Sequence, residues 1–189
     1  MLPLLPTHFK HLSLLTAVLL LTACATTPKT YSNIDTSIDF AQYKTYSFFA
    51  ELATDRPGYE SLESRFLKAA VSREMEQRGF SYADESDLQI NFNINTKEKI
   101  YSRSTPSAGG YYGYRGSYYG AWGGYETRID QYTEGTLNID VIDAGMKKLV
   151  WEGAVIGRVN EEALDNLEAT LSASVHVIFN EFPIARPAQ

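Results

Sequence analysis

A strict alternation of apolar and polar residues over residues 87–95 limits most strongly what this chain can fold into. One side of an extended strand here carries apolar residues, namely Leu88, Ile90, Phe92 and Ile94. The other side carries polar residues, namely Gln89, Asn91, Asn93 and Asn95. Successive side chains of a strand point to opposite faces. The segment therefore requires a sheet with one buried face and one face open to water.

Further elements are predicted on both sides of this strand. A strand or a pair of strands is expected within residues 38–49, and a hairpin is expected from residues 137–141 and 149–156 around the turn residues 143–145. Apolar residues at helical spacing predict helices over residues 59–78 and from Asn160 to the stop at Pro183. Gly79 suits the end of the first helix, and Asn160 suits the cap of the second.

This order of elements predicts an α+β fold. We expect two layers, with a largely antiparallel sheet and two helices packed on one face. Residues 31–185 are expected to form a single domain, because that length suits one hydrophobic core.

The amino terminus has the pattern of an export signal. Lys10 precedes a weakly polar to apolar run over residues 12–21, which is too short to span a bilayer. The run ends in Leu21-Thr22-Ala23-Cys24, which resembles the lipobox of bacterial lipoproteins. We therefore expect residues 1–23 to be a signal peptide and residues 24–30 to be a lipidated tether, small and polar after Cys24.

Lipid on Cys24 would fix where the protein resides. A single acyl chain binds membranes only marginally, whereas this lipoprotein type carries three, so attachment should be lasting. Ala25 follows the cysteine where, by resemblance to known lipoprotein sorting, an aspartate would retain the protein in the inner membrane. The expected location is the outer membrane, on its periplasmic face.

Charge and cysteine content exclude several function classes. The chain has 17 Lys and Arg against 23 Asp and Glu, a formal net charge of −6, and loss of Lys10 with the signal makes it more acidic. An acidic surface repels phosphates, so no nucleic-acid partner is expected. Cys24 is the one cysteine, so no disulfide is expected, and the covalent lipid is the one non-protein group expected.

The sequence contains no recognisable catalytic or metal-binding set. After removal of the signal the one histidine is His176, expected at the boundary or surface of the last helix, and a lone histidine makes a poor metal site. Paired carboxylates are the alternative, because two acids can flank a glycosidic bond. The candidates are Asp84, Glu85 and Asp87 before one strand, and Asp140 and Asp143 near the end of another. Each also suits an ordinary strand end or turn.

A segment rich in glycine and tyrosine, at about residues 105–126, is the best candidate for a binding loop. Aromatic rings give large, rigid contact surfaces and glycine lets a loop adapt, so the segment could bind an envelope protein or peptidoglycan. A solvated loop without a fixed role is the other interpretation. The candidate contact residues are Tyr111, Tyr112, Tyr114, Tyr118, Tyr119, Trp122 and Tyr125.

Several short motifs resemble a known family. They are YKTY at residues 43–46, GTL at 135–137 with Asp140, and LVWEG at 149–153, followed by Phe182 and Pro183. They resemble small Gram-negative lipoproteins that share a domain of unknown function. The resemblance implies a lipid-anchored, periplasm-facing α+β domain and supplies no catalytic residues.

The motif residues themselves favour structural roles. Tyr43, Tyr46 and Trp151 are expected to pack in the core, and Gly135 and Gly153 are expected at a bulge or a close backbone approach. The leading hypothesis is therefore a non-enzymatic binding or scaffold module of the envelope. The alternative is a carboxylate-dependent hydrolase acting on envelope glycans or peptidoglycan.

Overall fold

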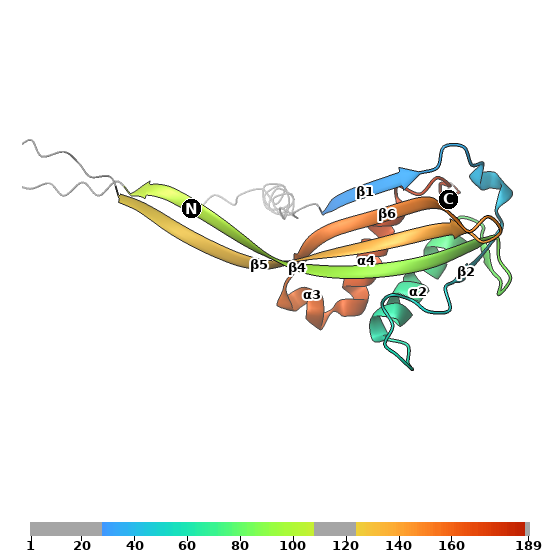
Figure 1. The fold of residues 1–189 in the computed structure, drawn as a ribbon, viewed down its shortest axis with the longest axis horizontal. Coiled ribbons are helices and arrows are strands. Elements are labelled where there is room, and N and C mark those ends of the chain that lie inside the picture. Colours follow the sequence, from blue (N-terminus) through green and yellow to red (C-terminus); the bar gives the residue numbers. More distant parts are fainter. Residues whose placement is uncertain (1–27, 108–123, 188–189) are drawn as a thin grey trace, which may run out of the picture.

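Six strands form one sheet in the computed structural model, which describes residues 28–107 and 124–187 (Figure 1). The strand order is β1-β6-β5-β4-β2-β3. Strands β1, β6, β5 and β4 pair antiparallel, while β2 pairs parallel with both β4 and β3. The bounds are β1 Lys29–Ile34, β2 Thr45–Phe48, β3 Ser81–Tyr82, β4 Leu88–Ser107, β5 Gly124–Asp143 and β6 Lys148–Val159.

The helices lie together on one side of this sheet (Figure 1). They are α2 (Leu62–Glu76), α3 (Glu161–Asp165) and α4 (Leu167–Phe179), and a 3-10 turn, η1 (Phe40–Gln42), precedes β2. This arrangement confirms the predicted α+β fold with a largely antiparallel sheet. Ser61 caps α2 by accepting a hydrogen bond from the Ser64 amide at 3.0 Å, and Gly79 ends it with a φ of +90°.

The core lies between the sheet and the helices, as the alternation in β4 requires. Leu88, Ile90 and Phe92 have no exposed surface, and they pack with every second residue of β5 and with the inner sides of α2 and α4. The opposite face of the sheet carries the polar members of each strand, and none of the described elements covers it. The period-two pattern therefore decides which face the helices occupy.

Trp151 is the centre of this core, as expected from its motif. Its ring packs against Phe179 and Phe182, and its Nε1 donates to Ser32 Oγ at 3.0 Å across to β1. Gly153 lies beneath the indole, and a Cβ there would clash with the Trp151 ring and would lie 2.5 Å from the Ile178 side chain of α4. The glycine is needed because the indole occupies the space that a side chain would fill.

An ion cluster around the buried Glu74 fastens the carboxyl-terminal segment to the helices. The Glu74 carboxylate of α2 accepts from Arg78 at 2.6 Å, from Arg186 at 2.5 Å and lies 3.1 Å from His176 Nδ1. Burial alone would raise the pKa of Glu74, but the hydrogen bonds from Arg186 and Arg78 outweigh it and lower that pKa. Arg78 also donates to the carbonyls of Phe179 and Ile184, so the cluster joins three segments.

Two sequence expectations need correction, in the last helix and in the tether. The predicted last helix is two helices, because Asn166 leaves helical geometry (φ −117°, ψ 45°) and its side chain donates to the Glu162 carbonyl. The strand expected within residues 38–49 is confirmed as β2, and the 3-10 turn η1 precedes it, capped by the Asp39 carboxylate, which accepts from the Ala41 amide. Strand β1 begins at Lys29, inside the expected tether; its mostly exposed side chains gave no apolar signal.

A glycine-to-alanine pair in β6 tests the packing at Trp151. We expect Gly153→Ala to lower the free energy of unfolding by about 1–3 kcal/mol, because the new methyl group must displace Trp151 or Ile178. Gly157→Ala is the matched control, since no atom lies within 4 Å of a Cβ at that position. Urea unfolding measures both variants. Equal stability of the two would contradict the close approach.

Candidate functional site: the β4–β5 arm

Strands β4 and β5 extend far beyond the rest of the sheet. They pair without interruption over 20 residues each, from Leu88 opposite Asp143 to Ser107 opposite Gly124. Strand β2 reaches only Ile90 on β4, and β6 reaches only Thr133 on β5. The ribbon of residues 97–107 and 124–134, which β6 joins only at its base through Thr133 and Glu134, is called the arm here. It projects from the body of the domain (Figure 1) and spans about 35 Å at the usual rise per residue.

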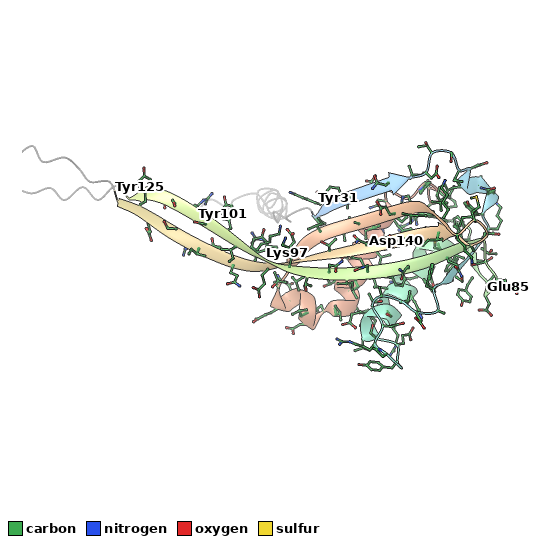
Figure 2. All side chains as sticks on the ribbon, in the orientation of Figure 1. Tyr31, Glu85, Lys97, Tyr101, Tyr125 and Asp140 are labelled. Atoms are coloured by element: carbon green, nitrogen blue, oxygen red, sulfur yellow. The ribbon has the colours of Figure 1, made fainter. Side chains whose placement is uncertain are left out.

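The two faces of the arm differ in charge. Residues directly opposite one another share a face, so the charged face carries Lys97, Lys99, Tyr101, Arg103, Glu126, Arg128, Asp130, Tyr132 and Glu134. The neutral face carries mainly hydroxyl and apolar side chains. Its large apolar residues are strongly exposed, with Ile100 at 70%, Ile129 at 67% and Tyr125 at 74%. Figure 2 shows Lys97 at the base of the arm, with Tyr101 and Tyr125 further out. The arm thus presents apolar surface with nothing described to cover it.

A few side-chain contacts hold the arm together. At its base Lys99 forms an ion pair with Glu134 at 3.3 Å, and Arg158 of β6 lies over the Tyr132 ring at 4.2 Å. Gln131 donates to Glu98 at 3.1 Å on the neutral face. Further out, Arg103 lies directly opposite Arg128. Like charges at opposite positions destabilise a strand pair. The outer arm keeps a hydrogen bond between the Ser104 and Thr127 hydroxyls at 3.2 Å, but among the described residues no ion pair joins its two strands.

The arm carries part of the predicted binding loop. Tyr125 belongs to β5, pairs with Pro106 and is exposed. The other candidates lie outside the described residues, as does the predicted lipidation residue Cys24. Those candidates are Tyr111, Tyr112, Tyr114, Tyr118, Tyr119 and Trp122. Tyr125 was predicted from the composition of the segment, whereas Ile100 and Ile129 were not predicted as contact residues. These two isoleucines alternate with polar neighbours, and the same pattern occurs in any strand with one buried face.

Two of the candidate carboxylates have structural partners. Asp143 accepts from the Met146 amide at 2.7 Å and from the Tyr43 hydroxyl at 2.7 Å, and the Met146 hydrogen bond does most to lower its pKa. Burial, together with this carboxylate, raises the pKa of Tyr43 to about 12. Asp87 accepts from the Lys44 and Thr45 amides, which lower its pKa. Both carboxylates therefore hold turns and strand ends.

The pairing of Asp140 with Asp143 is not supported by their placement. Asp143 is buried beside Tyr43, whereas Asp140 alternates with buried Ile139 and Val141 and so lies on the open face of the sheet. Asp84 and Glu85 are exposed before β4, and Figure 2 shows Glu85 at the end of the body away from the arm, with Asp140 in mid-sheet. The structure does not bring the five candidates together.

Asp140 instead belongs to a row of polar residues that crosses four strands. The register places Asn33, Glu152, Asp140 and Asn91 side by side on β1, β6, β5 and β4. Asn33 donates to Glu152 at 2.6 Å, while Asn91 Oδ1 is buried and has no partner among the described residues. Burial first, and the Glu152 charge second, raise the pKa of Asp140. Glu152 was missed because its position opposite Asp140 depends on the register of β5 and β6.

Other possible sites are less developed. His176 is exposed, as expected, and belongs to the Glu74 cluster.

A shallow groove of about 680 Å³ lies between α2 and the α3–α4 junction, lined by Phe66, Arg73 and Leu164 among others. Within residues 28–107 and 124–187, no group of three His, Cys, Asp or Glu side chains could hold a metal ion, and none of the helices is long and apolar enough to cross a membrane.

The fold and the arm define this protein as an α+β domain with helices on one side of an extended sheet. Residues 30–184 match the domain of unknown function DUF4136, so the chain belongs to that family. No curated protein matches it.

Among solved structures, a PDZ domain protein from Parabacteroides distasonis is similar over 82% of this chain, with 11% identity and a TM-score of 0.54. The chain covers only 35% of that protein, and the likeness shows the fold alone. Two crystal forms of the PelC dodecamer from Paraburkholderia phytofirmans match 80% and 86% of this chain, and 94% and 100% of their own, at 8% and 9% identity. Their TM-scores of 0.44 and 0.46 support no further argument.

The titration of Asp140 tests the polar row. We expect Glu152→Gln to lower the pKa of Asp140, because the neighbouring negative charge is removed, but to leave it above that of an ordinary aspartate, because burial is the larger cause. Carboxyl carbon NMR follows the titration, with Asp143 as an internal reference. An Asp140 pKa that does not change would contradict the side-by-side placement.

Proposed function

We propose that this protein is a lipid-anchored lipoprotein of the outer membrane, facing the periplasm, and that it acts as a non-enzymatic binding or scaffold module. The observation that carries the binding role is the arm, which exposes Ile100, Ile129 and Tyr125 along one face of a long ribbon. Soluble domains rarely expose apolar side chains on a projecting ribbon without a partner. The address rests on the export signal and the lipobox before Cys24.

The position of β1 is compatible with a lipid anchor on Cys24. Lys29 pairs with Ile156, which pairs with Thr136, so the strand begins level with the base of the arm. Five residue steps separate Cys24 from Lys29, and a fully extended chain of that length reaches about 18 Å at most. Lipid on Cys24 would therefore hold the base of the arm close to the membrane surface and limit where its binding surface can reach.

A carboxylate-dependent hydrolase acting on envelope glycans or peptidoglycan is the second candidate. The observation in its favour is the Asp140–Glu152 pair, in which one acid has a raised pKa and the two face solvent together. The pair lies on a flat polar sheet face, and none of the described grooves includes either residue. Peptidoglycan turnover by the purified protein that is lost in Asp140→Asn would favour this candidate over the scaffold.

Mass spectrometry of the processed protein tests the anchor. We expect a product that begins at Cys24 and carries three acyl chains, found in outer-membrane fractions. Cys24→Ser should retain residues 1–23, because the lipid acceptor is absent. Ala25→Asp is the matched control: it should remain lipidated but shift toward the inner membrane. A free Cys24 thiol in the wild-type protein, or a wild-type product that keeps its first 23 residues, would contradict the proposed address.

Removal of the aromatic segment tests the binding role. Since Ser107 lies opposite Gly124, an Asn-Gly turn can replace residues 108–123 and close the hairpin without changing the described arm. We expect this variant to keep wild-type stability but to lose the envelope partner that is crosslinked to the wild-type protein in cells. A second variant of full length, with serine at the six aromatic positions from Tyr111 to Trp122, separates the loss of rings from the loss of length. Equal partner recovery from all three proteins would remove the segment from the binding role.

A further inference from the structure

We propose that the outer half of the arm is a self-association surface, and that two copies of this chain pair through their β5 edges in an antiparallel, two-fold arrangement centred on Thr127. The proposal deepens the scaffold role by naming a second copy as one partner. It rests on the proposed membrane anchor only in that a shared membrane concentrates the two copies.

The outer arm has two unpaired edges that need an explanation. Beyond Ile90 no described strand pairs with the outer side of β4, and beyond Thr133 none pairs with the outer side of β5. A two-stranded hairpin alone is marginally stable in water, and open edges readily pair with another chain. Both edges are open over residues 97–107 of β4 and residues 124–132 of β5. The charge pattern along each edge indicates which of the two can pair with a second copy.

The β4 edge is protected against its own copy. On the charged face this strand carries Lys97, Lys99 and Arg103 and no acid. Antiparallel pairing of two β4 edges would therefore bring basic residues together or leave them unmatched. Lysine and arginine on an open edge commonly prevent such pairing.

The β5 edge, in contrast, is complementary to itself. A two-fold axis at Thr127 places Glu126 opposite Arg128 of the second copy, and the symmetry repeats this pair. On the neutral face the same axis places Tyr125 opposite Ile129, again twice. Both side chains are strongly exposed in the single chain, at 74% and 67%. The arrangement thus forms two ion pairs and brings the exposed Tyr125 and Ile129 side chains of the two copies into contact.

This pairing also offsets the like charges that stand at opposite positions within each chain. Arg128 lies directly opposite Arg103, and neither belongs to an ion pair among the described residues. In the dimer, Glu126 of the second copy lies beside Arg128 and offsets that repulsion. The paired segment, residues 124–130, ends before Thr133, where β6 occupies the same edge.

Antiparallel pairing of β4 with β5 of the next copy is excluded by size. Such copies would point the same way, with neighbouring arms two strands or about 10 Å apart. The six-stranded body is about 24 Å wide at the usual strand spacing, so parallel copies would collide. The two-fold arrangement places the bodies at opposite ends of the paired arms and avoids this collision.

Crosslinking of the full-length protein in isolated membranes tests the proposal. Thr127→Cys lies on the axis and should form a disulfide-linked dimer on mild oxidation. Ser102→Cys on β4 is the control for position and should give no dimer above background. The wild-type protein controls for Cys24: a wild-type dimer would show a free Cys24 thiol and count against the lipid anchor, whereas Thr127 crosslinking no stronger than that of Ser102 would overturn the two-fold pairing.

Charge variants separate loss of pairing between copies from loss of folding of the arm. Arg128→Glu and Arg103→Glu both remove the Arg–Arg contact within the chain, so both should leave the arm intact. In the Thr127→Cys background, only Arg128→Glu places like charges across the axis, and it should weaken association roughly tenfold or more. Exchanging both charges, Glu126→Arg with Arg128→Glu, should restore the dimer. Equal crosslinking of the two single variants, or no recovery in the exchanged variant, would contradict the pairing.

Discussion

The uninterrupted pairing of β4 with β5 determines both the core of this domain and the position of its arm. Its inner half supplies the centre of the sheet, where Phe92 and Ile139 face the helices and form the core. Its outer half leaves the body as the arm. Because one ladder runs through both halves, the position of the arm is fixed by the register of the core. A shift of one residue would exchange the buried and open faces, so core packing also decides which side chains the arm presents on each face.

The body beyond this ladder provides support on one side only. Helices α2 and α4 cover one face, Trp151 fills the space between α4 and β6, and the Glu74 cluster ties the carboxyl-terminal segment to both helices. The other face keeps a polar row across four strands. The domain therefore has two parts, a packed body covered by helices and a ribbon that extends away from it. Strand β1 and the proposed anchor lie where the two parts meet.

Period and turn chemistry were enough to predict much of the fold. The alternation in residues 87–95 predicted the covered and open faces of the sheet. The helix end at Gly79, the helix cap at Asn160 and the turn at residues 143–145 were also predicted correctly. Strand β1 was missed because an edge strand with exposed side chains has no apolar period. The length of the arm was missed because strand pairing, and not burial, extends β4 past Asn95. The predicted pair of Asp140 with Asp143 was wrong, because Asp143 accepts hydrogen bonds from Tyr43 and Met146. The acid beside Asp140 is Glu152, and only the register of β5 and β6 places it there.

NMR contacts between the backbones of β4 and β5 test whether the two strands remain paired to the outer end of the arm. We expect cross-strand Hα–Hα or amide contacts between opposite residues of the charged face, such as Tyr101 with Asp130 and Arg103 with Arg128, together with extended-strand chemical shifts through residues 97–105 and 126–134. Random-coil shifts in these two segments, without contacts between them, would contradict this pairing, because an unpaired arm would present neither face in a fixed arrangement.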